Sequence, residues 1–228
     1  MAKIKLFCSN SLRGALTDLI PAFERASGHQ VEISYDPAKV MMQRIGRGET
    51  ADAVIIGGEA IDQLAKQGKV TAGSKRAFAS CGIGVAVRAG AKKPDIGSVE
   101  AFKRALLEAK SIAWTQQGAS GIYFSGLIER LGIADQVKPK AAQQPGGLIA
   151  EQLVNGKADL AIQQVPELMA VPGAELVGPL PKEIQQVTAS SAGIFAGSQN
   201  AKAAEELLAF LTSPASKAVL KAKGLEPA

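Results

Sequence analysis

The sequence predicts a two-lobed α/β protein, on three observations. Apolar segments of strand length alternate with amphipathic helical segments from residue 3 to residue 68, and a second such alternation runs from residue 99 to residue 163. This alternation is typical of parallel sheets covered by helices. Two longer segments, Arg76–Arg88 and Ile184–Phe195, have an extended pattern instead. We expect them to be the chain crossings between lobe one, residues 1–80 plus 193–228, and lobe two, residues 81–192.

The first alternation opens with a strand and an amphipathic helix. Residues 3–8 have the composition of a strand, and the apolar residues from Leu12 to Phe23 then recur at helical spacing until Gly28 ends the helix. Glycines also follow the later helices of this lobe. The other expected elements are strands at 31–35 and 53–58 and helices at 38–47 and 61–66.

The second alternation follows the same logic, with Gly132 and Gly156 as helix ends. It predicts helices at 99–109, 122–131 and 148–154, and strands at 111–115, 139–143 and 158–163. Two closing helices are expected at 203–211 and 214–223.

The composition is that of a soluble globular protein, with 46% apolar and 21% charged residues in a chain of 228. The net charge of +5 comes from scattered basic residues without interleaved aromatics, which argues against nucleic-acid binding and suits a small anionic ligand. The sequence contains no run of about 18 apolar residues, so it predicts no membrane-spanning helix. Met1 leads directly into the first strand, so we expect a cytoplasmic protein, or a periplasmic one if a leader has been removed.

Metal, cofactor and nucleophile signatures are missing from the sequence. Cys8 and Cys81 have no metal-ligand spacing; buried free thiols and a disulfide both remain open. His29 is the only histidine, so no Ser-His or Cys-His pair can form. No G-x-G-x-x-G follows a strand. We therefore expect no metal and no cofactor.

The first candidate ligand-binding segment is Ser9-Asn10-Ser11, between the first strand and the first helix. It lies beyond the carboxyl end of a strand, where open α/β sheets bind ligands. A helix N-terminus also offers free N–H groups and a dipole that favours anions. The alternative is simple helix capping, for which one such residue is enough.

The second candidate segment runs from Gln116 to Tyr123 and contains Gly118, Ser120 and Gly121. It follows a short apolar strand and opens another helix, and its glycines let backbone approach a ligand closely. The alternative is a turn with a cap. Together the two segments would form an anion clamp.

Weaker signals come from three further places. Gln163 and Gln164 end an apolar strand, where their amides can bind ligand oxygens or form a polar turn before Pro166. The segment Pro145-Gly146-Gly147 opens another expected helix. Lys39 sits at a helix start, where the alternative is an ordinary solvated lysine.

In this order, the motifs resemble the bacterial molybdate-binding proteins of ABC transporters and their wider relatives, with a type II periplasmic-binding-protein fold. The resemblance covers essentially the whole chain. It rests on Ser11-Leu12, Ala51-Asp52-Ala53, Gly121-Ile122-Tyr123 and the closing helices at 207–220. It implies an anion held in a cleft between the lobes, which close by hinge motion.

The resemblance also assigns ligand positions. Ser11 matches the family's first-loop serine and Ser120 its third-loop serine. The second-loop serine falls at Ala38, the fourth loop at Gly147 and the tyrosine ligand at Gln164, so two ligand residues are altered. The expected ligand-binding residues are Ser9, Asn10, Ser11, Ala38, Lys39, Gly118, Ser120, Gly121, Tyr123, Gly147 and Gln164.

Two functions are expected from these residues. The first is a monomeric binding protein for a small anion, an organic carboxylate rather than molybdate, working with an ABC-transporter membrane component. The second follows from a branch similar to aconitate isomerase, which the segments 163–168 and 177–185 resemble. An isomerase of a small unsaturated polycarboxylate needs a proton carrier, for which Lys39 and Tyr123 are the candidates.

Overall fold

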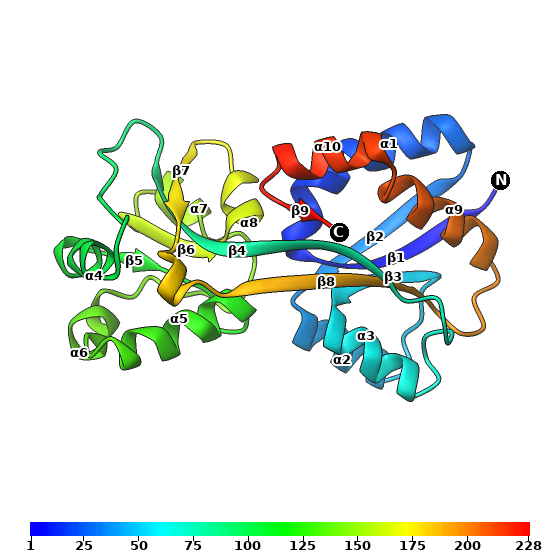
Figure 1. The fold of residues 1–228 in the computed structure, drawn as a ribbon, viewed down its shortest axis with the longest axis horizontal. Helices are drawn as coiled ribbons and strands as arrows, with labels where there is room; N and C mark the ends of the chain where they lie inside the picture. Colours follow the sequence, from blue (N-terminus) through cyan, green and yellow to red (C-terminus); the bar gives the residue numbers. More distant parts are fainter. The chain divides into compact units, whose positions relative to one another are not determined.

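The computed structural model describes all 228 residues and divides into two compact units (Figure 1). Unit 1 comprises Met1–Ser80 and Thr188–Ala228, and unit 2 comprises Cys81–Val187. Both divisions fall inside strands, β4 (Arg76–Arg88) and β8 (Val187–Ile194). The chain therefore passes from one unit to the other through strand segments rather than loose linkers.

In unit 1, the strands that precede the candidate loops are parallel. The order is β2-β1-β3-β8, in which β1 pairs parallel to both β2 and β3, and β8 runs antiparallel to β3. Because carboxyl ends of parallel strands meet at one edge, the helices that follow all begin there. The elements are β1 (Lys3–Ser9), η1 (Asn10–Leu12), α1 (Arg13–Ser27), β2 (Gln30–Asp36), α2 (Ala38–Gly46), β3 (Ala53–Gly57) and α3 (Gly58–Lys66).

Helices cover both faces of this sheet. Figure 1 shows α2 and α3 on one face, and α1 with the closing helices α9 (Ala201–Leu211) and α10 (Pro214–Ala222) on the other. Phe7 packs among α2 and α3 side chains, including Met41 and Ile61. The short strand β9 (Glu226–Pro227) pairs with Ala79 and Ser80 of β4.

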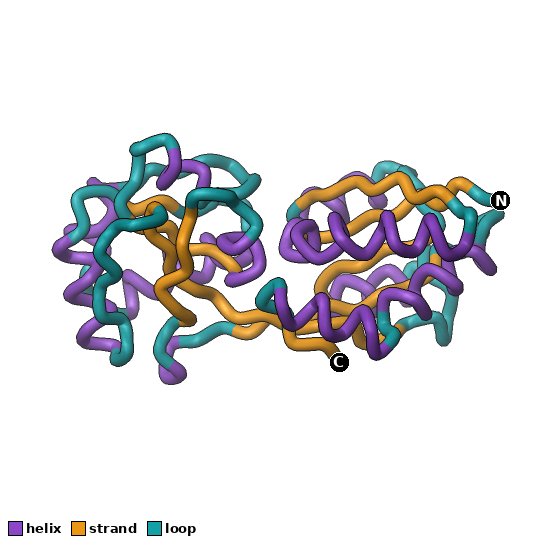
Figure 2. Tube along the Cα trace, turned by 90° about the horizontal axis from the view of Figure 1, so that it is seen from above, coloured by secondary structure: helices purple, strands orange, loops and turns teal.

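Unit 2 repeats the layered plan with a mixed sheet. From Cys81 onward, β4 pairs antiparallel with both β6 and β7, and β5 pairs parallel to β6. Helices pack around these strands (Figure 2). The elements are α4 (Val99–Glu108), β5 (Ile112–Ala113), α5 (Ala119–Arg130), α6 (Ala134–Val137), η2 (Lys138–Lys140), α7 (Glu151–Val154), β6 (Leu160–Gln164), α8 (Val165–Met169), β7 (Ala174–Pro179) and η3 (Lys182–Ile184).

Several expected elements of this unit differ from the structure. The strand expected at 139–143 is wrong: η2 occupies its start, and only Ala141 bridges to Ile112. The helix expected from residue 148 begins at Glu151, and the one expected from residue 122 begins at Ala119. No helix of either unit has both the length and the apolar character needed to cross a membrane.

A buried carboxylate ties the elements of unit 1 together. Asp52, which is 8% exposed, accepts hydrogen bonds from Lys5 N at 2.8 Å and from Ser198 Oγ at 2.6 Å. Asn200 Nδ2 donates to the same carboxylate at 3.3 Å. Asp52 thus joins β1, the start of β3 and the turn before α9.

We predict that Asp52→Ala lowers the free energy of unfolding by about 2 kcal/mol or more, because several donors lose a charged acceptor. Urea unfolding measures this change. The control is Asp18→Ala, which removes an exposed ion pair to Lys223 and should cost less than about 1 kcal/mol. Equal effects of the two substitutions would contradict a structural role for Asp52.

Candidate ligand-binding loops

The loop after β1 presents hydroxyl groups that the helix does not use. Ser9 lies at the cap position of η1, with φ −69° and ψ 148°, yet it makes no capping hydrogen bond. Its Oγ lies 3.3 Å from Ser11 Oγ, and Ser11 is 8% exposed. Asn10 is half-buried between them. Simple capping therefore does not account for this loop.

The neighbouring helix starts of unit 1 are also uncapped. Pro37 precedes α2 and Gly57 precedes α3, and neither helix receives a side-chain cap. By contrast, Ser98 caps α4 and Ser213 caps α10 through their hydroxyls. Free N–H groups thus collect at the carboxyl edge of the parallel strands, where an anion can satisfy them.

The loop after β2 adds a positive charge to this edge. Ser9 of β1 lies opposite Asp36 of β2, so the two loops are neighbours. Ala38 and Lys39 form the first turn of α2; Ala38 is half-buried, and Lys39 is exposed without a partner in unit 1. Arg13, in contrast, is exposed and stacks on the Tyr35 ring at 4.3 Å.

In unit 2, the start of α5 depends on two glycines. A Cβ on Gly118 would lie 2.4 Å from Thr115 Oγ1, and one on Gly121 would lie 1.7 Å from Thr115 O. Only glycine therefore lets the chain after β5 fold back onto the first turn of α5. This packing leaves the buried hydroxyl of Thr115 without a hydrogen-bond partner.

Of the two hydroxyl side chains near this helix start, one makes a hydrogen bond within unit 2 and the other does not. Ser120 is 4% exposed, and its hydroxyl has no partner within unit 2. The hydroxyl of Tyr123 donates to Ile184 O at 2.9 Å. Tyr123 therefore anchors the chain before β8, and its proton is not free in this structure. Ser120 and the α5 N–H groups are the available donors.

The two glutamines at the end of β6 have different tasks. Gln163 accepts from Ile149 N at 2.9 Å and donates to Gly147 O at 2.8 Å, so it holds the glycine loop in place. Gln164 precedes α8; its side chain is 7% exposed and has no partner within unit 2. Gln117 N donates to Pro145 O at 3.0 Å, which brings the same glycine loop beside the start of α5.

A buried carboxyl that the sequence patterns did not single out lies next to Gln164. Glu167, in the first turn of α8, is 8% exposed, and burial raises its pKa to about 8, partly offset by the backbone N–H of Gln164. Burial and the nearby Glu167 charge raise the pKa of Cys81 to about 12. The sequence signal was Pro166 followed by Glu167, which is typical of a helix start.

The remaining sequence candidates play no part in these loops. Cys8 and Cys81 are both buried and free, so no disulfide forms. No group of three or more His, Cys, Asp or Glu side chains has the arrangement of a metal site. His29 Nε2 lies 3.2 Å from Glu206 Oε2, and its Nδ1 accepts from Ala2 N.

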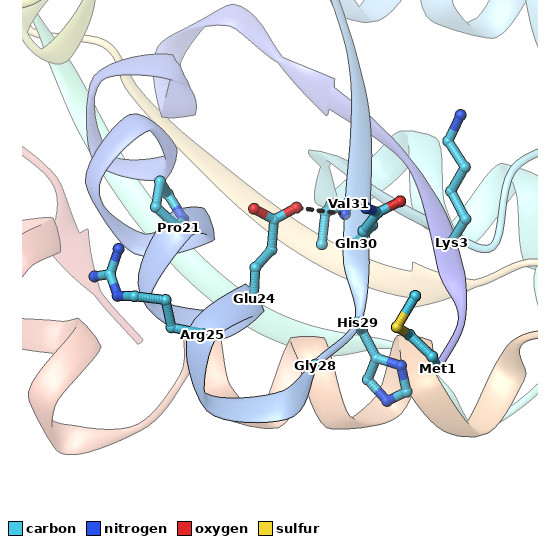
Figure 3. A pocket seen from close by; sticks show the side chains of 9 residues that line it. All are labelled: Met1, Lys3, Pro21, Glu24, Arg25, Gly28, His29, Gln30 and Val31. Atoms are coloured by element: carbon cyan, nitrogen blue, oxygen red, sulfur yellow. Dashed lines mark hydrogen bonds between the residues drawn. The ribbon is translucent and has the colours of Figure 1, made fainter.

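His29 also lines a cavity of about 590 Å³ in unit 1 (Figure 3). The cavity lies at the starts of β1 and β2, the opposite edge from the donor loops. On its wall, the backbone N–H of Val31 donates a hydrogen bond to Glu24 Oε1 at 2.8 Å. This cavity is therefore separate from the candidate ligand-binding loops.

Comparison with known proteins agrees with this architecture. The chain matches the family described as bacterial extracellular solute-binding protein over residues 4–226. It is 33% identical to aconitate isomerase from Pseudomonas sp over 98% of this chain and 87% of that protein. It is 26% identical to the molybdate-binding protein ModA of Azotobacter vinelandii over 98% of this chain and 89% of ModA.

Solved structures confirm the fold class. The periplasmic molybdate-binding protein of Azotobacter vinelandii superposes with a TM-score of 0.80 at 20% identity, over 97% of this chain and 98% of that one. The two-lobed α/β fold predicted from the sequence is therefore confirmed, as is the resemblance to the molybdate-binding branch.

We predict that Glu167 makes the protein less stable as pH rises from about 4.5 to about 8. In this window the folded state keeps a proton that the unfolded chain has lost, so the free energy of unfolding falls by about 1.4 kcal/mol per pH unit. Urea unfolding of wild type and Glu167→Gln at pH 5, 6, 7 and 8 measures the difference. Parallel pH profiles of the two proteins would contradict it.

Proposed function

This chain belongs to the family of bacterial extracellular solute-binding proteins, and we propose that its solute is a small organic di- or tricarboxylate. The observation that carries the proposal is the set of uncapped helix starts with serine hydroxyls that no helix uses. In unit 1 these are Ser9 and Ser11, which bond only to each other, and in unit 2 it is Ser120. Groups of this kind bind anionic oxygens.

Three side chains favour an organic carboxylate over molybdate. Ala38 and Gln164 stand where the molybdate-binding family is expected to carry a serine and a tyrosine, and Lys39 adds an ammonium at the start of α2. A tetrahedral oxyanion suits a ring of neutral donors, whereas a carboxylate chain extends further and can meet a separate point charge. The similarity to aconitate isomerase supports the same ligand class, because aconitate is a tricarboxylate.

The second candidate function is isomerisation of such a ligand, and Glu167 favours it. A proton shift between carbons needs a group that gives and takes a proton near neutral pH. Glu167, whose pKa is raised to about 8 and which lies three residues from Gln164, has that property. As a binding protein, the chain would instead pass its ligand to the membrane component of an ABC transporter.

One experiment separates these functions. Calorimetry with molybdate, sulfate, citrate, fumarate and trans-aconitate identifies the ligand class, and proton NMR of trans-aconitate with the protein in D₂O detects turnover. Binding without a new isomer or deuterium incorporation supports the binding protein. Tight molybdate binding with no response to any carboxylate would overturn the proposal.

We predict that Ser11→Ala and Ser120→Ala each weaken carboxylate binding by about 10- to 150-fold, because each removes a hydrogen bond to a charged group. Calorimetry measures the change, and thermal melting checks that the fold survives. The control, Ser27→Ala, alters a hydroxyl at the far end of α1 that donates to Phe23 O. Less than a twofold effect of both site variants would reject the assignment.

We also predict that Lys39→Ala abolishes the preference for the carboxylate over molybdate without changing the melting temperature. Lys39 is exposed and makes no contact that unit 1 needs, so its loss removes only a point charge for the ligand. The ratio of the two affinities is the readout. Lys66→Ala, at the exposed end of α3, is the control; an unchanged ratio in the Lys39 variant would refute the role.

A further inference from the structure

The start of α3 carries donor groups that the proposed site does not use. Gly57 ends β3 and Gly58 begins α3, and no side chain caps the helix. Its first N–H groups therefore have no partner inside the helix, and the dipole there favours a negative charge.

The hydroxyl of a largely buried serine lies at this helix start. β8 lies beside β3 (Figure 1) and runs antiparallel to it, with Ser191 opposite Ile56 in the strand register. Ser191 is 6% exposed, and its Oγ lies 3.2 Å from the position that a Cβ on Gly58 would occupy. This hydroxyl has no partner within unit 1, whereas that of the adjacent Ser190 donates to Ala79 O at 2.8 Å. The hydroxyl is therefore free to donate to a ligand atom that reaches this helix start.

An ammonium group lies at the same place. Lys75 Nζ is 4.0 Å from the same Cβ position on Gly58 and bonds to Asp62 Oδ1 at 2.6 Å. Asp62 orients the ammonium, which has two further N–H donors. The other charged side chain of this turn, Glu59, is exposed.

Gly57 leaves this corner open. Its φ of −50° is accessible to any residue, and a Cβ there would meet nothing within 4 Å. Neither backbone conformation nor packing within unit 1 requires a glycine at this position. A bare backbone is what close approach of a ligand to the N–H groups needs.

We propose that Gly57, Gly58, Ser191 and Lys75, here called the α3 corner, bind one carboxylate of the ligand; this rests on the proposed function. Parallel pairing of β1 with β3, with Cys8 opposite Ile55, places the corner beside the loop after β1. Unit 1 then has two neighbouring anchors for anionic oxygens. A ligand with several carboxylates can occupy both, whereas a single tetrahedral oxyanion needs only one.

The test is calorimetry of trans-aconitate binding to Ser191→Ala, Lys75→Gln and Gly57→Ala. Each should weaken binding about tenfold or more, because each removes or blocks a donor to a charged group. The matched controls are Ser190→Ala and Lys66→Gln, which should stay within twofold of wild type. Gly57→Ala adds a methyl group in open space, so we expect this variant to fold. Its affinity decides the test if another variant has a lowered melting temperature.

The outcomes separate the corner from the proposed function. If Ser11→Ala weakens trans-aconitate binding while all three corner variants bind like wild type, the α3 corner is overturned and the proposed function stands. If wild type binds none of trans-aconitate, citrate and fumarate, the proposed function is overturned, and the corner with it. Losses confined to the corner variants, with both controls unaffected, support the corner.

Discussion

The parallel pairing of β1 with β2 and β3 is the constraint on which the candidate site depends. Parallel strands need crossover connections, and each crossover here is a helix that begins at the carboxyl edge of the sheet. Hydrogen bonds along β1 therefore fix where three helix starts converge, whatever their side chains. In unit 2, the parallel pair β5 and β6 does the same for α5 and α8. The backbone brings the helix starts to one edge, and in the proposed function side chains such as Ser11 and Lys39 add donors to that edge.

The helix starts at these sheet edges lack interactions that would stabilise the folded protein. A serine cap such as those on α4 and α10 is worth about 1 kcal/mol, and the helix starts at the donor loops lack one. The orphaned Thr115 hydroxyl beside α5 is a further local cost. Compensation lies at the other end of unit 1, where Asp52 accepts from three donors, one in β1 and two in the turn before α9. Such an uneven distribution is typical of proteins whose polar groups await a ligand.

The sequence predicts elements well where periodicity and glycine signals agree. The boundaries of β4 match the expected 76–88, and Gly28 ends α1 in the left-handed conformation as expected. The pattern misled at 139–143, where five residues are too few to distinguish a strand from a turn. Side-chain contacts between distant segments could not be predicted from the sequence. Gln163 is hydrogen-bonded within unit 2 whereas the Gln164 side chain is not, and the Tyr123 hydroxyl donates to Ile184 O. Nor did the sequence show that Ser191 lies against the start of α3. These depend on contacts between segments distant in sequence.

Binding and isomerisation of one ligand differ in a single requirement, a group that exchanges protons with carbon. Lys39 is exposed at a helix start, and the Tyr123 hydroxyl is committed to Ile184. Glu167 combines burial with a pKa raised to about 8, so near neutral pH it can both hold and release a proton. In the proposed function the same donor loops suit a binding protein or an enzyme, and Glu167 is the group whose substitution distinguishes the two.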